Sequence, residues 1–188
     1  MTQLPDNAAE VLTGIARRAI THRAHLRPSA DAPALPDEPW LKQPGAVFVT
    51  LNVDGRLRGC IGSLEAYRPL GEDVAANAVA ASSRDLRFVE VEPEELDDID
   101  IEVSVLSAPE RITFTSKEDA LAQLRPGIDG VILAHGNHRA TFLPQVWEKL
   151  DNPEEFMALL MRKAGLRFDF WADDIELSRY TVTPLHES

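Results

Sequence analysis

Cysteine is nearly absent from this sequence, because Cys60 is the only one among 188 residues. No internal disulfide can form, and a lone thiol is typical of a reducing compartment, so we expect a cytoplasmic protein. Long apolar runs are also missing, since none approaches the roughly 20 residues of a membrane-spanning helix. Met1 to Asn7 carries no basic cluster of the kind that opens an export signal. We therefore expect no association with a membrane.

Positive charge is scarce as well. Nineteen Lys and Arg residues against 31 Asp and Glu residues give a formal net charge of -12. Such a charge repels phosphate backbones unless a local basic patch overrides it, and the sequence shows no such patch, so nucleic-acid binding is not favoured. His135 and His138 have no cysteine or carboxylate at the usual ligand spacing, and no glycine-rich phosphate loop is present. We expect neither a bound metal nor a cofactor.

The chain is long enough, and at 44% hydrophobic residues apolar enough, to fold as one domain with a core of its own. Apolar residues at helical spacing predict a first helix that Asp6 can cap and that ends near Arg27. Five prolines between Pro28 and Pro44 then predict an extended arm, neither helix nor central strand. We expect residues 1–27, 28–44 and 45–188 to form the helix, the arm and the main body of a single domain.

Alternating strand patterns and helical patterns together predict an α+β fold. The clearest local signal is a hairpin over residues 46–61 with its turn at Asp54-Gly55. The other expected elements are an alanine-rich helix opened by Pro69, strands at 99–106 and 112–114, a helix beginning at Ser116, a hairpin over 130–143, a helix from Asn152 to Gly165 and a strand at 175–183.

The main candidate site is Arg58-Gly59-Cys60-Ile61-Gly62 in the second strand of the first hairpin. Strand alternation puts Arg58 and Cys60 on one face, where a guanidinium would favour the thiolate that a nucleophile or metal ligand requires. Gly59 and Gly62 would let a ligand or another backbone come close. Alternatively, Cys60 is a buried structural residue, the glycines serve a bend, and a bulge at Gly59 breaks the alternation.

A second candidate is the segment Arg84-Asp85-Leu86-Arg87-Phe88, whose two arginines suit an anionic group. The alternative is a salt-bridge cluster that ends a helix and places Phe88 in the core. The acidic residues of the following stretch, 90–100, are expected to lie in a solvated connecting segment.

At the level of motifs, Leu57-Arg58-Gly59-Cys60-Ile61-Gly62 followed by Ser63-Leu64 resembles the signature hexapeptide of the AMMECR family. The resemblance runs from about Gly45 to the C-terminus. A second segment is similar to the sequences of a bacterial branch of the family called AmmeMemoRadiSam system protein A. This segment is Ala140-Thr141-Phe142-Leu143-Pro144-Gln145-Val146-Trp147-Glu148. The branch takes its name from its genes, which lie beside genes for a Memo-like protein and a radical S-adenosylmethionine protein.

The resemblance implies a mostly antiparallel sheet with flanking helices, a larger and a smaller lobe, and a cleft near the hexapeptide. It makes Cys60 and Arg58 the catalytic candidates. The residues it suggests for the cleft are Gly59, Gly62, Arg84, Asp85, Arg87 and Gln145. Many relatives have a cysteine in the late helix, where this chain has Met161, so a two-cysteine mechanism is not supported here.

Two functional hypotheses follow. In the first, the chain is an enzyme or enzyme component acting with Memo-like and radical S-adenosylmethionine partners, and Cys60 is a nucleophile or ligand. In the second, it is a non-catalytic binding or adaptor module for a small molecule, peptide or partner surface, and Cys60 is structural. The genetic neighbourhood that the branch implies favours the first. In either case Arg58 should face a partner charge or a ligand.

Overall fold

The computed structural model describes residues 4–25 and 33–187, and it divides the chain into two compact units. The first unit is Met1–Leu106 together with Thr183–Ser188, and the second is Ser107–Val182. The predicted helix end at Arg27 and the start of the predicted arm at Pro28 lie outside the described residues. Two units fit the expected larger and smaller lobe.

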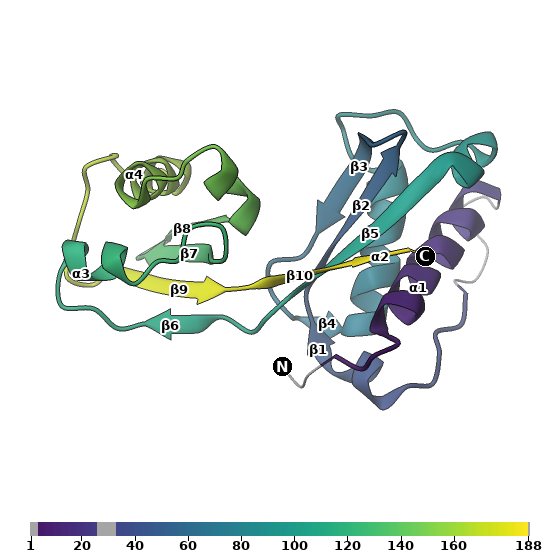
Figure 1. The fold of residues 1–188 in the computed structure, drawn as a ribbon, viewed down its shortest axis with the longest axis horizontal. Helices are drawn as coiled ribbons and strands as arrows, with labels where there is room; N and C mark the ends of the chain where they lie inside the picture. Colours follow the sequence, from purple (N-terminus) through teal and green to yellow (C-terminus); the bar gives the residue numbers. More distant parts are fainter. Residues whose placement is uncertain (1–3, 26–32, 188) are drawn as a thin grey trace. The chain divides into compact units, whose positions relative to one another are not determined.

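The first unit is a four-stranded sheet with two helices on one face (Figure 1). The strand order is β10-β5-β2-β3, formed by Val182–His186, Ile99–Leu106, Val47–Val53 and Arg56–Gly62. The helices are α1 (Ala8–His25) and α2 (Leu70–Ser83), and β2 pairs antiparallel with both neighbours. The predicted α+β class with a mostly antiparallel sheet is confirmed.

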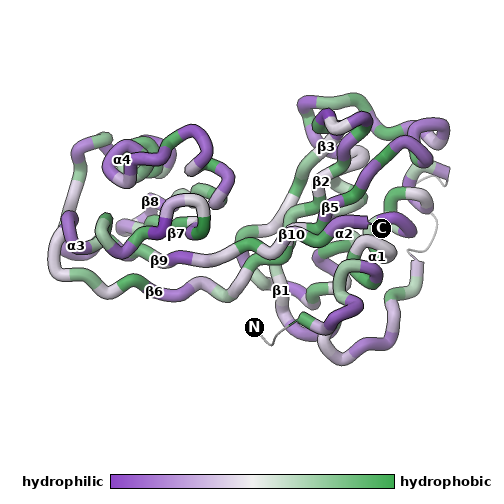
Figure 2. The backbone as a smooth tube through the Cα atoms, in the orientation of Figure 1, coloured by the Kyte–Doolittle hydropathy of each residue, from purple (hydrophilic) through white to green (hydrophobic). Residues whose placement is uncertain are grey.

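One hydrophobic core joins these helices to the sheet. Val47, Val49 and Leu51 point from β2 towards the helices and are fully buried. Helix α1 contributes Leu12 and Ile15 to the same core, as the helical spacing predicts. In Figure 2 the hydrophobic residues of α2 appear green along its length. The site strand β3 is therefore held on its helix-facing side by a packed core.

Part of the predicted arm is more ordered than its prolines suggest. Residues Pro39–Lys42 form a 3-10 turn, η1, with Pro39 in the first position, and Leu41 is buried in the core. Proline is tolerated at this position because its missing N–H would have no helical partner. Pro44–Gly45 (β1) then pairs with Arg68–Pro69 (β4). The prediction that this stretch contains no helix is wrong for η1.

The second unit contains another antiparallel sheet, in the order β6-β9-β7-β8. These strands are Glu110–Ile112, Glu176–Tyr180, Gly130–His135 and His138–Phe142. Its helical elements are α3 (Lys117–Ala122), η3 (Pro144–Glu148) and α4 (Pro153–Lys163). Trp147 stacks on Phe156 with ring centroids 3.7 Å apart in the core of this unit.

Two strand predictions need correction. The strand expected through Phe114 ends at Ile112, and Phe114 instead contacts Trp171 beyond the strand. The strand expected over 175–183 is two strands in different sheets, β9 in the second unit and β10 in the first. Between them, Ser107 and Thr181 exchange two hydrogen bonds of 2.9 Å, from the Ser107 N–H to the Thr181 carbonyl and from the Thr181 N–H to Ser107 Oγ.

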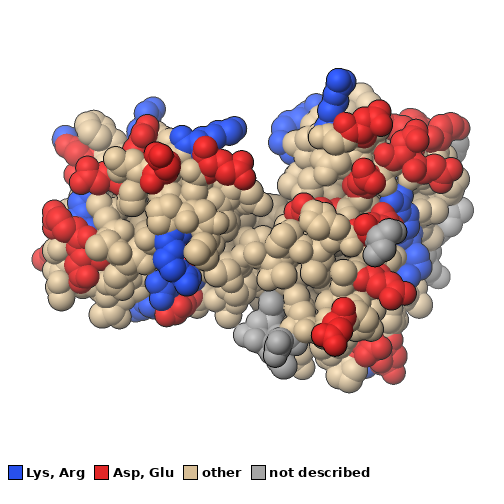
Figure 3. Space-filling model, in the orientation of Figure 1, with Lys and Arg blue, Asp and Glu red and all other residues tan. Residues whose placement is uncertain are grey.

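Charge is distributed unevenly over the first unit. Figure 3 shows acidic side chains gathered on the first unit near η2 (Pro93–Asp98), the 3-10 turn that precedes β5 in Figure 1. Among the described residues, no helix has the length and apolar character needed to cross a membrane.

Candidate functional site

The candidate site lies along the free edge of β3, the outermost strand of the first sheet. Residues 84–90, here called the 84–90 loop, lie against this edge. The Cys60 N–H donates to Asp85 Oδ2 at 2.9 Å, and the Cys60 carbonyl accepts from Arg87 Nη2 at 3.4 Å. Asp85 and Arg87 also form a salt bridge of 2.6 Å with each other. The two side chains thus satisfy the backbone groups that a further strand would otherwise pair with.

Arg58 clamps the far end of the same loop. Its guanidinium makes a bidentate contact with Glu95, at 2.8 and 2.9 Å, and donates to the carbonyls of Val89 and Glu90 at 2.8 and 3.3 Å. The side chain is mostly buried, with 14% exposed. Arg58 faces a partner charge, Glu95, as expected, and its other hydrogen bonds go to the backbone of the loop and not to the thiol.

The relation predicted between Arg58 and Cys60 changes because β3 contains a bulge. Leu51 pairs with Gly59 and Asn52 with Leu57, so Arg58 is an extra residue in the ladder. The simple alternation that put Arg58 and Cys60 on one face therefore does not hold. The predicted alternation fails beside Gly59, because a glycine in a strand pattern allows a bulge.

Cys60 is half-buried and has one side-chain partner: the Thr50 hydroxyl donates to Cys60 Sγ at 3.3 Å. Thr50 lies directly opposite on β2. The side chains of both residues lie on the sheet face away from the helices, because their neighbours Val49, Leu51 and Gly59 face the helices. The thiol is thus neither in the helix-facing core nor part of a nucleophile and base pair among the described residues.

The two glycines of the motif are required by close packing. A Cβ on Gly59 would lie 2.2 Å from the carbonyl oxygen of Ala81 near the end of α2. A Cβ on Gly62 would lie 2.3 Å from the Phe48 ring and 2.6 Å from the Val47 carbonyl oxygen. Real Cβ atoms do not approach so closely, so both positions need glycine for the strand to pack as it does.

Electrostatics hold the loop in its charged form. The hydrogen bonds from Arg87, followed by the Cys60 N–H, hold the pKa of Asp85 well below its ordinary 3.8 against the opposing effect of burial. The contact with Arg58 likewise lowers the pKa of Glu95 from 4.5. Asp85 in turn raises the pKa of Arg87. All of these groups are ionised at neutral pH, so the loop contacts are charge-assisted.

We expect these carboxylates to make the protein less stable in acid. Each has a folded-state pKa below its unfolded value, so its stabilising contribution is complete above about pH 4.5 and decreases as the pH falls below that. An Asp85→Asn variant should be less stable than the wild type by about 1–2 kcal/mol at pH 7. This difference should shrink below about pH 3.8 in guanidinium unfolding curves, and a constant difference down to pH 2 would contradict the assignment.

The other candidates are placed elsewhere. Arg84 is exposed just after α2, and its side chain lines a separate pocket beside that helix. Gln145 is exposed in η3 of the second unit. Phe88 is half-buried, lies 5.4 Å from the Arg87 guanidinium and is not in the core, contrary to the core alternative. The structure therefore brings together Arg58, Cys60, Asp85 and Arg87, with Gly59 and Gly62 as packing residues.

Sequence reasoning missed Glu95, which it assigned to a solvated connecting segment. In the structure Glu95 anchors Arg58 and also accepts a hydrogen bond from the Glu92 N–H at 2.9 Å, in a capping box that opens η2. The pattern Glu92-Pro93-Glu94-Glu95 was the available signal, because an acid three residues after a capping acid marks an ordered helical start.

His135 and His138 each contact a group of the second unit. His135 Nε2 lies 3.1 Å from Asp174, and His138 Nδ1 lies 2.8 Å from the Ala164 carbonyl oxygen. Within the described part of the chain, no three His, Cys, Asp or Glu residues gather in a way that could hold a metal ion.

The fold and the site define an α+β protein with two antiparallel sheets, in which a glycine-containing edge strand holds an exposed loop. The family model AMMECR1 matches residues 13–185, so the chain belongs to the AMMECR1 family. A protein of Methanothermobacter thermautotrophicus is 40% identical over 188 residues, covering 98% of this chain and 96% of that protein. A Thermotoga maritima protein is 40% identical over 151 residues, covering 79% and 81%.

A solved structure is also similar. The crystal structure of an uncharacterized protein from Pyrococcus horikoshii aligns with a TM-score of 0.77 and 34% sequence identity, covering 96% of this chain and 92% of that one. The likeness extends over both units of the fold.

Proposed function

We propose that this AMMECR1-family protein is a protein-docking module, and that the 84–90 loop is its contact element. One observation carries the proposal: Leu86 is fully exposed, at 100%, on a loop that is held to β3 by hydrogen bonds with the Cys60 backbone and the Arg58 side chain. Val89 on the same loop is 81% exposed. Exposed apolar side chains on an ordered loop are suited to an apolar pocket on another protein.

The restraints on the loop matter because a flexible loop must become ordered when it binds, and this ordering weakens the affinity. Asp85 and Arg87 fix the loop near its start, Arg58 fixes it at Val89 and Glu90, and the Val91 N–H donates to the Ser82 carbonyl at 2.8 Å. A loop held in this way loses little conformational entropy on binding. The hexapeptide motif thus holds the loop through the Cys60 backbone and the Arg58 guanidinium.

A second candidate is the enzyme or enzyme component, with Cys60 as nucleophile or ligand. The observation that favours it is a half-buried thiol that is hydrogen-bonded to Thr50, on the strand that also binds Arg87 through its backbone. Both hypotheses share the same first partners to test, a Memo-like protein and a radical S-adenosylmethionine protein, together with a cytoplasmic location. A small molecule or peptide would be bound by the complex.

The docking proposal is tested by replacing Leu86 with aspartate and measuring binding to the purified Memo-like and radical S-adenosylmethionine proteins by biolayer interferometry. We expect at least a tenfold loss of affinity, since a central apolar anchor contributes more than about 1.4 kcal/mol. Stability should not change, because Leu86 buries no surface. Ile128→Asp is the control, since it places the same charge on an apolar residue of the second unit that is 51% exposed.

The same binding measurement on a Cys60 variant, together with alkylation of the thiol, separates the two candidate functions. A Cys60→Ala variant should keep its affinity if the chain is a docking module, and the thiol should be alkylated no faster in the folded protein than in the denatured chain. Rapid alkylation of folded protein, or loss of a product that depends on Cys60, would favour the enzyme. Binding that survives Leu86→Asp unchanged would remove the docking proposal.

A further inference from the structure

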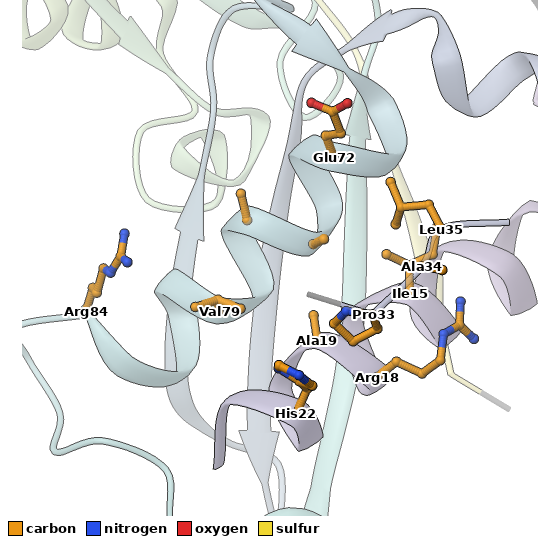
Figure 4. Close-up of a pocket in the computed structure, with 12 residues that line it drawn as sticks. Ile15, Arg18, Ala19, His22, Pro33, Ala34, Leu35, Glu72, Val79 and Arg84 are labelled. Carbon is orange, nitrogen blue, oxygen red and sulfur yellow. The ribbon is translucent and has the colours of Figure 1, made fainter. Parts of the chain in front are cut away.

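The first unit contains a pocket of about 440 Å³ beside its two helices (Figure 4), and Arg84, the first residue of the 84–90 loop, is part of its lining. Its walls are α1, α2 and residues 33–35. This volume is within the range of small-molecule sites, which are usually apolar with a few well-placed polar groups.

The two helices contribute matching faces. Both sets of lining residues follow the i, i+3, i+4, i+7 spacing of a single helix face. From α1 these are Ile15, Arg18, Ala19 and His22. From α2 they are Glu72, Ala75, Ala76 and Val79. Seven residues of helix span about 10 Å, so the pocket is an elongated groove. The alanines leave its middle open and apolar.

The charged residues of the groove are concentrated at its ends. Glu72 lies in the first turn of α2, whereas Arg84 follows its last turn, and Figure 4 shows them at opposite ends of that helix. Arg18 adds positive charge from α1, and His22 adds an imidazole. The groove therefore has one acidic end, an apolar middle and several basic side chains.

These basic side chains lack partners, unlike most arginines of this unit. Among the described residues, Arg18, His22 and Arg84 make no ion pair or side-chain hydrogen bond. The neighbouring Arg17 is bound to Glu187, and Arg68 to Asp73. Unpaired arginines beside an apolar groove, in a chain of net charge -12, are suited to an anion that brings its own apolar surface.

We propose that this groove binds an elongated amphipathic anion, such as an acyl carboxylate. The apolar body lies along Ala75, Ala76 and Val79, and the anionic group is bound by Arg84 at the end of the groove away from Glu72. A cationic ligand with the same apolar body is disfavoured by Arg18 and Arg84. Arg84 belongs to the 84–90 loop, but its side chain lines the groove, and the groove's binding of an anion does not depend on docking at Leu86.

The test uses 8-anilinonaphthalene-1-sulfonate as a fluorescent anionic probe on the folded wild-type chain. Its fluorescence should saturate with one site, and dodecanoate should displace it at a concentration at least tenfold lower than dodecyltrimethylammonium, which has the same alkyl chain and the opposite charge. Ala76→Trp should abolish saturable binding by filling the groove. Arg84→Gln should weaken dodecanoate binding about tenfold.

Arg56→Gln is the matched control, since Arg56 is exposed at the start of β3 and lines no part of the groove. The melting temperature of each variant is measured, and binding is compared at a temperature where every variant is fully folded. The probe then reports a site and not partial unfolding. No saturable binding by the wild type, or binding unchanged by Ala76→Trp, would overturn the groove as the site. Equal displacement by dodecanoate and dodecyltrimethylammonium would overturn the anionic class of ligand.

Discussion

Gly59→Ala should lower the free energy of unfolding by about 3 kcal/mol, the upper part of the range for a side chain forced into a packed interior. Its Cβ would meet the Ala81 carbonyl oxygen at 2.2 Å, and that oxygen belongs to backbone that cannot rotate aside. Relief requires β3 to move away from α2. The Cys60 contacts with Asp85 and Arg87 would then be disturbed as well.

Gly14→Ala is the matched control, because it is the same substitution within α1. There the new Cβ would lie 3.4 Å from the movable Arg18 guanidinium, and alanine is a better helix former than glycine. We expect it to raise stability by about 0.5–1 kcal/mol. Guanidinium unfolding at pH 7 measures both effects. Equal effects of the two substitutions would show that the close approach at Gly59 is not what the motif requires.

Asp73→Ala should have an equally large effect, about 3–5 kcal/mol, because Asp73 is a fully buried carboxylate with four hydrogen-bond donors. The donors are the Val47 N–H at 2.9 Å, Ser63 Oγ at 2.7 Å, Arg68 Nε at 2.7 Å and Asn77 Nδ2 at 3.0 Å. Removing the acceptor leaves the buried Val47 N–H and Ser63 hydroxyl without this partner. Arg68, whose side chain is 26% exposed, loses its ion pair, and Asn77 keeps its bond to the Val47 carbonyl.

This network joins the start of β2, the residue after β3 and the first turns of α2, so its loss weakens the whole first unit. Ser63→Ala is the control, since it removes one member of the network and should cost about 1 kcal/mol. Chemical denaturation followed by tryptophan fluorescence compares the two. A loss below about 1 kcal/mol for Asp73→Ala would mean that the cluster contributes no more than a surface contact.

Local patterns were sufficient to predict much of the fold. The hairpin of β2 and β3 is where Asp54-Gly55 predicts it, and both turn residues have the positive φ values, 51° and 71°, that such a turn requires. Ser116 caps α3 by accepting from the Asp119 N–H, also as predicted. These signals were readable because the interacting groups are neighbours in the sequence.

The features that sequence reasoning missed depend on contacts between distant residues. Arg58 and Glu95 are 37 residues apart, and no local pattern connects them. The bulge at Arg58 goes with the close approach of Gly59 to α2, which is a property of the packed unit. Only Thr181 separates β9 from β10, so the sequence shows one strand where the structure has two in different sheets.

The division of the chain into its two units has a consequence for synthesis. The second unit is a continuous stretch, Ser107–Val182, whereas β10, a strand of the first unit, follows it in the sequence. A ribosome therefore completes the second unit before it adds the strand that pairs with β5. During translation the second unit can fold as soon as it emerges, while the first sheet waits with the edge of β5 unpaired.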